Sequence, residues 1–249
     1  MSWKGSRNCS PGWYLWLVGW WTQRLLPMLR DVWLVVGKDL LIEMRARVGI
    51  NQIVPFAVIV LLLFAFALDT DQAALRTYAP GLFWVTVLLA SLLAIGRSFA
   101  VDLADGTSDR LLLSGIEPVA AFLGKVIAIA VQLVVLELLL SLGVLLLFDV
   151  SVQRFGLLVS AGLVGALGLA VAGTLYGALV AGLGMRESLL PVLLLPVVAP
   201  VMLGATRAFQ DAFGVAGAQG WAWLGLLVGF AAIYGLFGAL SYGTLLEEA

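Results

Sequence analysis

Histidine is absent from this sequence, and Cys9 is its only cysteine. A chain without histidine cannot by itself build a histidine-type zinc site, a histidine-ligated haem or a histidine acid–base catalyst. A lone thiol can form neither an internal disulfide nor a cysteine-rich metal site. We therefore expect no metal site and no directly bound cofactor in this chain.

Charged residues are also scarce: they make up 12% of the 249 residues, against about 25% in a typical soluble domain. Hydrophobic residues make up 62%, so there are too few charges to cover a soluble core. Six runs each hold roughly the 20 apolar residues that cross about 30 Å of hydrocarbon; they cover residues 48–68, 77–96, 126–148, 155–185, 188–206 and 212–246. Because the runs are continuous rather than short and alternating, they predict helices and not strands. The predicted fold class is all-α integral membrane, with six transmembrane helices.

The positions of Lys and Arg predict the orientation. Seven of the fourteen basic residues precede the first run. An N-terminus on the inside puts eleven basic residues on the cytoplasmic side and three outside, and basic loops stay cytoplasmic. Six crossings return the chain to the side where it began, so both termini are expected to be cytoplasmic.

The N-terminal region is rich in tryptophan: six of the nine tryptophans precede the first run. A signal peptide is one interpretation, but no small-residue cleavage site follows Trp21. Tryptophan prefers the membrane interface, and we favour a dispensable extension that rests on the membrane. The expected domains are this extension, residues 1–28, and a six-helix transmembrane domain, residues 29–249.

Ahead of the first run the pattern becomes amphipathic. Val32, Val36, Leu40 and Met44 recur every four residues, and the charged residues fall elsewhere around the helix. Such a helix is expected to lie in the interface plane and to enter the bilayer near Gly49. It is either a simple anchor or an elbow that steers the first span.

Glu137 lies in the middle of the third apolar run. A charged residue at the bilayer centre costs about 2.5–3.5 kcal/mol on insertion scales, so the side chain should face protein or water. It either lines a cavity or subunit seam, or it is a protonated carboxyl group hydrogen-bonded to backbone or to Thr174.

Pro191, Pro196 and Pro200 interrupt the fifth run. Each proline removes a backbone donor and kinks a helix, which membrane helices tolerate where neighbours or water satisfy the freed carbonyls. A kinked helix of this kind suggests a part that changes shape; a static kink is the alternative.

Two glycine pairs have GxxxG spacing, Gly173 with Gly177 and Gly225 with Gly229. Small residues let helix backbones approach closely. The pairs predict close packing within the chain or, alternatively, a homodimer face.

Between the second and third runs, residues 97–113 are predicted to form an acidic loop that contains Asp102, Asp105 and Asp109. Aspartate caps helix starts and suits the positive end of the helix dipole, so a short amphipathic helix can begin at Asp105 and end before Pro118. The loop is either a docking element for a soluble partner or a solvated acidic turn. The sequence has no Walker lysine loop, so the chain does not hydrolyse nucleotide by itself.

The loop sequence from Arg97 to Gly106 resembles the Phe-x-x-Asp-x-x-Asp-Gly loop of the CcmB family, the permease-like subunit of the haem-handling ABC transporter of cytochrome c maturation. Asn51 at the start of the first span and the segments 78–93 and 190–200 are also similar to that family. The resemblance runs from about residue 28 to residue 246. Ser108, Ser114-Gly115 and the tryptophan-rich extension depart from the family pattern.

The resemblance implies an ABC-2-like subunit in a bacterial cell membrane, which works in a pair with a second copy. It implies docking of the ATPase CcmA on the loop, with Phe99, Asp102, Asp105 and Gly106 as contacts and Asp109 completing the acidic set. CcmC, CcmD and the haem chaperone CcmE would complete the complex, and ATP hydrolysis would drive release of haem-loaded CcmE. Haem would be handled by the complex, with axial ligands from other subunits.

Three other functions are compatible with the sequence to different degrees. The first is an ABC-2 permease that exports a lipid, glycan or drug. The second is an intramembrane enzyme with Glu137 as its acid, but no second carboxylate or histidine lies at matching depth. The third, a self-sufficient secondary carrier, lacks a visible inverted repeat. Membrane lipid is an expected partner and nucleic acid is not.

Overall fold

The computed structural model describes residues 12–47, 49–67, 72–104, 115–148, 151–182, 189–215, 217 and 219–247. Within these residues every element is helical, which confirms the all-α prediction. In chain order the elements are α1 (Gly12–Ala46), the π-helix η1 (Gly49–Ile53), α2 (Val54–Ala67), α3 (Gln72–Ala104), α5 (Pro118–Leu147), α6 (Phe155–Gly182), α7 (Leu189–Ala212) and α8 (Gly220–Glu247).

Five of these helices, α3, α5, α6, α7 and α8, are long and apolar enough to cross a membrane. The predicted first span is different. Helix α2 has 14 residues, a length of about 21 Å, short of the roughly 30 Å of a hydrocarbon core. A sixth crossing exists if residues 26–46 of α1 and 51–67 are counted together, as a pair bent by 55°.

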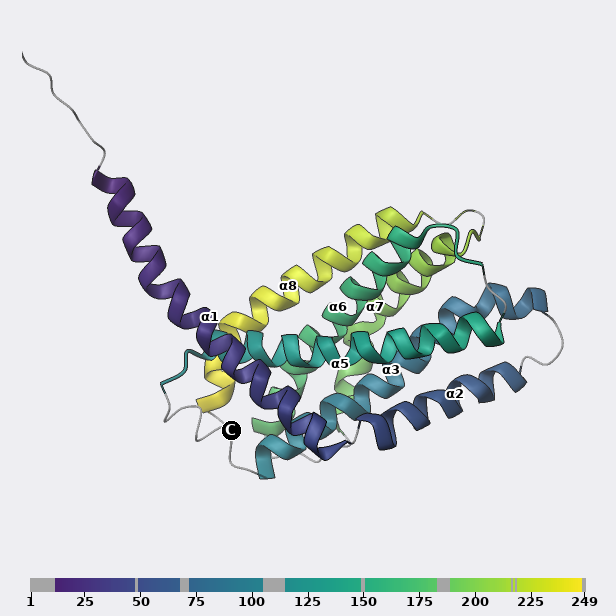
Figure 1. Cartoon of the computed structure of the whole chain (residues 1–249), viewed down its shortest axis with the longest axis horizontal. Helices are drawn as coiled ribbons and strands as arrows, with labels where there is room; N and C mark the ends of the chain where they lie inside the picture. Colours follow the sequence, from purple (N-terminus) through teal and green to yellow (C-terminus); the bar gives the residue numbers. More distant parts are fainter. Residues whose placement is uncertain are drawn as a thin grey trace, which may run out of the picture.

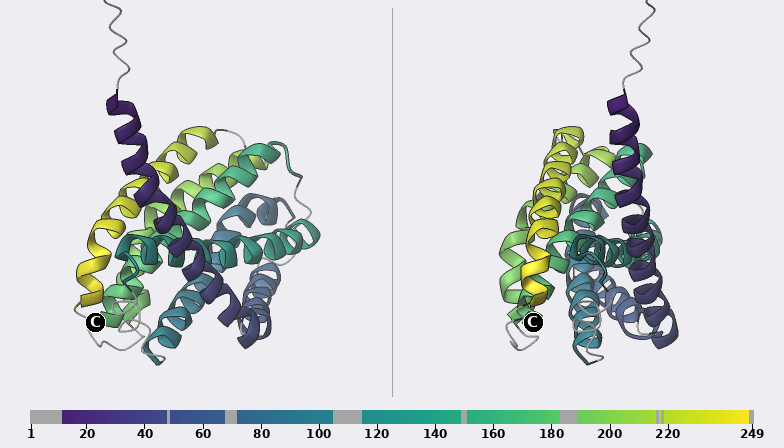
Figure 2. Two further views of the ribbon diagram at one scale, coloured as in Figure 1. Left: turned by 60° about the vertical axis from the view of Figure 1, so that its left-hand side comes forward. Right: turned by 90° about the vertical axis from the view of Figure 1, so that its left-hand side faces the viewer.

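The bend has a local cause. Arg47 adopts a left-handed backbone conformation with φ of 52°, which ends an α-helix, and the chain resumes as the π-helix η1 before α2. Figures 1 and 2 show α1 running obliquely to the other helices, with its N-terminal part extending away from them. The bend lies near Gly49, where the sequence predicts that the amphipathic helix gives way to the first span.

Helix α6 lies at the centre of the fold and packs against α3, α5, α7 and α8. Helix α1 packs against α5, and α2 packs against α3 and α5. Three α6 glycines lie so close to α3 that an added Cβ would overlap a side chain; the pairs are Gly165–Trp84, Gly173–Ile95 and Gly177–Phe99. The Gly173–Gly177 pair thus packs within the chain, one of its two predicted roles. At Gly225 and Gly229 an added Cβ meets none of the described atoms within 4 Å.

The helix bundle has two ends. One contains the C-terminal end of α3 and the start of α5; we call it the Lys125 end, and it lies at the lower left of Figure 1. The other contains the end of α7 and the start of α8, at the upper right; we call it the Asp211 end.

Candidate functional site: a buried charge network

Helix α3 continues through Ala104, which corrects the predicted loop boundary. Phe99 and Asp102 therefore lie in the last turns of a helix and not in a loop that starts at Arg97. The other predicted loop residues, Asp105, Gly106 and Asp109, lie outside the described residues.

Asp102 is part of a network of four charged side chains from three helices. Lys38 and Asp39 come from α1, Asp102 from α3 and Lys125 from α5. The Lys38 Nζ atom lies 2.9 Å from Asp39 Oδ1 and 3.0 Å from Asp102 Oδ1. The Lys125 Nζ atom lies 3.4 Å from Asp39 Oδ2 and also contacts Asp102 Oδ2. Each lysine thus contacts both aspartates, and the charges balance.

The network is buried at Lys125 and Asp39 and partly open to the outside at Lys38. The side chain of Lys125 is 4% exposed, that of Asp39 7%, that of Asp102 17% and that of Lys38 36%. Lys125 Nζ also lies 4.7 Å from the centroid of the Phe99 ring, a cation–π distance. A buried ion that loses its partner costs about 3–5 kcal/mol, so Lys125 and its two aspartates hold α1, α3 and α5 together.

Close packing of α1 on α5 places the network. A Cβ on Gly124, next to Lys125, would lie 2.6 Å from Val35 Cβ and 2.9 Å from the Val32 carbonyl oxygen. Val32 and Val36 are buried there together with Ala120. The predicted apolar stripe of α1 thus faces α5 for most of its length. Among residues 26–46 of α1, the large apolar side chains that are exposed are Leu26, Leu29, Trp33, Leu34, Leu41 and Met44.

Phe99 is buried against Gly177 of α6. In this chain its ring packs between α3 and α6 and beside Lys125. A direct contact between Phe99 and another protein, which the family resemblance implies, stays a prediction.

Glu137 on α5 is buried inside the protein and does not face lipid. Its Oε2 atom would lie 3.0 Å from a Cβ on Gly162 of α6. Its Oε1 atom has no hydrogen-bond partner among the described residues. The hydroxyl of Thr174, one suggested partner, donates instead to the Ala170 carbonyl at 2.7 Å.

The three predicted proline positions all lie in α7, which is one continuous helix. Pro196 and Pro200 are exposed on its outer side, while Leu194 and Val198 pack inward. A change of shape in this helix stays a prediction.

A smaller charged site lies at the Asp211 end. Asp211 accepts a hydrogen bond from Arg154 Nη1 at 2.5 Å and one from the Gly220 amide at 3.0 Å through the same oxygen, Oδ2. The backbone amides of Gln153 and Arg154 donate to the Ala212 carbonyl at 2.9 and 3.0 Å. These bonds join the segment before α6 to the end of α7, and the end of α7 to the start of α8.

Sequence reasoning missed Lys38, Asp39 and Lys125 as site residues. Lys125 gave a usable signal, since it follows Gly124 in the first turns of an apolar helix, where a charge needs a partner. Its partner on α1, Asp39, lies 86 positions away in the sequence, beyond the reach of local patterns.

These helices and their buried charges define a multi-pass integral membrane protein of the permease type. The chain matches the sequence model of the CcmB protein family over residues 30–245. It is 31% identical to heme exporter protein B of Haemophilus influenzae, over 72% of this chain and 80% of the relative. It is 33% identical to heme exporter protein B of Paracoccus denitrificans, over 73% of this chain and 83% of the relative. The chain belongs to the CcmB family.

Proposed function

We propose that this chain is the non-catalytic membrane subunit of an ABC transporter that handles haem for cytochrome c maturation. Membership of the CcmB family and the relatives' name, heme exporter protein B, support the haem system. The absence of a Walker lysine loop from the sequence supports ATP hydrolysis on a separate subunit, CcmA. CcmC, CcmD, CcmE and a second copy of this chain complete the proposed assembly in the bacterial inner membrane.

The charge network at the Lys125 end is the observation that favours a coupling role. Asp102 lies three residues before Asp105, where the proposed docking segment, residues 105–113, begins. Asp102 contacts lysines on both α1 and α5. A displacement of the end of α3 therefore exerts a force on both helices at once. In this proposal the Lys125 end faces the cytoplasm, and ATPase closure moves α3 against α1 and α5.

Charge reversal in the docking segment tests the proposal. Asp105→Arg should abolish cytochrome c maturation and co-purification of the ATPase, while the amount of protein in the membrane stays normal. Glu117→Arg is the matched control, because Glu117 is an exposed acidic residue at the same end, outside the Phe-x-x-Asp-x-x-Asp-Gly motif. Normal maturation and normal ATPase recovery with Asp105→Arg would refute docking at this segment.

A further inference from the structure

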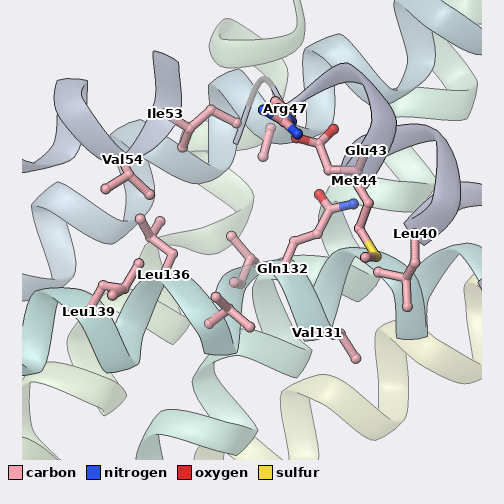
Figure 3. A pocket seen from close by; sticks show the side chains of 13 residues that line it. Leu40, Glu43, Met44, Arg47, Ile53, Val54, Val131, Gln132, Leu136 and Leu139 are labelled. Carbon is pink, nitrogen blue, oxygen red and sulfur yellow. The ribbon is translucent and has the colours of Figure 1, made fainter. Parts of the chain in front are cut away.

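The bend between α1 and α2 opens a groove against α5. Because the two helices diverge by 55°, they leave a space of about 340 Å³ between the end of α1, the start of α2 and the outer side of α5. Figure 3 shows this groove from close by. The groove lies along α5 from Val131 to Leu139, nine residues whose first and last Cα atoms are about 12 Å apart along the helix.

The groove is apolar along most of its walls and polar at one place. Ile53, Val54, Leu136 and Leu139 line one part. Three polar side chains, Glu43, Arg47 and Gln132, gather in another part, and in Figure 3 the Gln132 amide is turned toward Glu43. Among the lining residues Met44, Val135 and Leu139 are exposed, so the groove is open to the outside of the chain within its membrane-spanning part.

The shape and lining favour one class of occupant. Water needs two to four polar partners and finds none along the apolar walls. An empty groove forfeits the dispersion contacts of its lining. A hydrocarbon chain fills the apolar part, and the Arg47 guanidinium offers paired donors to a phosphate beside it. The Glu43 carboxylate in the same part of the groove favours a headgroup that also carries an ammonium group, as in phosphatidylethanolamine. We propose that a phospholipid is held in this groove, with one acyl chain along α5 and its phosphate on Arg47.

This lipid site is independent of the proposed transport role. In this site α1 and α2 both contact the acyl chain at the point where the two helices separate, so the lipid adds packing contacts to the bend. The occupant is one bound molecule, distinct from the exchanging lipids that surround every membrane protein.

Photo-crosslinking tests the site on the full-length protein. The protein is reconstituted in phosphatidylethanolamine–phosphatidylglycerol vesicles that contain a small fraction of phospholipid with a diazirine in one acyl chain. After irradiation and digestion, mass spectrometry locates the adducts. We expect adducts on Met44, Val135 and Leu139 to exceed severalfold those on Ile233 and Leu236, which are at least as exposed as Val135 and Leu139 but lie on α8.

Matched variants separate a held lipid from surface lipid. Leu139→Trp fills the groove and should reduce the groove adducts severalfold, whereas Leu138→Trp, at an exposed neighbour outside the groove lining, should leave them unchanged. Arg47→Glu should also reduce them, Arg47→Lys should keep most of them, and Arg45→Glu should leave them unchanged because Arg45 does not line the groove. Membrane insertion and helix content by circular dichroism verify that each variant folds.

Three results would overturn the proposal. The first is an even spread of adducts over all exposed apolar faces. The second is displacement of the groove adducts by added haem, with a haem absorbance that Met44→Ala abolishes, which would assign the groove to haem. The third is an inter-subunit disulfide through Leu139→Cys in a Cys9→Ser background, which would assign the groove to a second copy of the chain.

Discussion

The two ends of the molecule both place a buried aspartate against a basic side chain, but they use it differently. At the Asp211 end one aspartate binds one arginine and one backbone amide, and backbone hydrogen bonds join the same two segments. At the Lys125 end four side chains connect three helices, and the bonds between α1, α3 and α5 described there are ionic. The first arrangement fixes a corner between short connections. The second joins long helices through side chains alone.

This difference bears on which end can move. A corner held by backbone hydrogen bonds has one geometry, because the donors and acceptors are fixed to the chain. In the network at the Lys125 end each lysine has two aspartates to bind, so one helix can shift while every charge keeps a partner. We infer that the Lys125 end is suited to relative motion of helices and the Asp211 end to holding them in register.

The largest expected effect is that of Lys125→Met. This change leaves Asp39 and Asp102 without their buried cation, which should destabilise the fold by about 3–5 kcal/mol. We expect a clear fall in the melting temperature of the detergent-purified protein and a low level in membranes. Lys38→Met is the matched control. Lys38 is 36% exposed, so its loss should lower the free energy of unfolding much less. Equal effects of the two lysines would contradict the assignment of Lys125 as the central residue.

The next largest effect is expected at Gly124, where α1 rests on α5. Gly124→Ala places a Cβ 2.6 Å from Val35 Cβ and 2.9 Å from a backbone oxygen, and overpacking of this kind costs about 1–3 kcal/mol. Gly225→Ala is the control, since its Cβ meets none of the described atoms within 4 Å, and alanine favours a helix by about 1 kcal/mol over glycine. The melting temperatures should therefore move in opposite directions. An unchanged melting temperature for Gly124→Ala would mean that α1 does not pack against α5 as closely as described.

The sequence allowed the membrane helices to be predicted because bilayer thickness imposes a length on each apolar run. The five later runs agree with α3, α5, α6, α7 and α8 to within several residues at most ends. The sequence predicts the change of direction near Gly49, but it does not predict its form, because neither a left-handed residue at Arg47 nor the π-helix after it leaves a signal in the composition. The sequence prediction places Asp102 in a loop because the apolar run ends at Gly96, before Arg97, whereas ion pairs with Lys38 and Lys125 let Asp102 remain in the helix.

A smaller effect is expected from Arg154→Met at the Asp211 end. The Arg154 side chain is 56% exposed, and pairs with an exposed member contribute about 0–1 kcal/mol. The Gly220 amide and the two backbone bonds to Ala212 remain after the change. The melting temperature should fall by far less than with Lys125→Met, and maturation should stay normal. A loss comparable to that of Lys125→Met would remove the distinction drawn between the two ends.

The smallest effect is expected from Glu137→Gln. Glu137 lies on α5 between the two ends, and neither charged cluster includes it. The substitution keeps the size of the side chain, and no described residue bonds its Oε1 atom, so membrane level and cytochrome c maturation should be unchanged. Glu137→Lys is the contrasting variant, because a fixed charge buried against Gly162 should prevent stable insertion. If Glu137→Gln inserted normally but lost maturation, a protonatable group in mid-membrane would be required for function, and coupling could not be assigned to the Lys125 end alone.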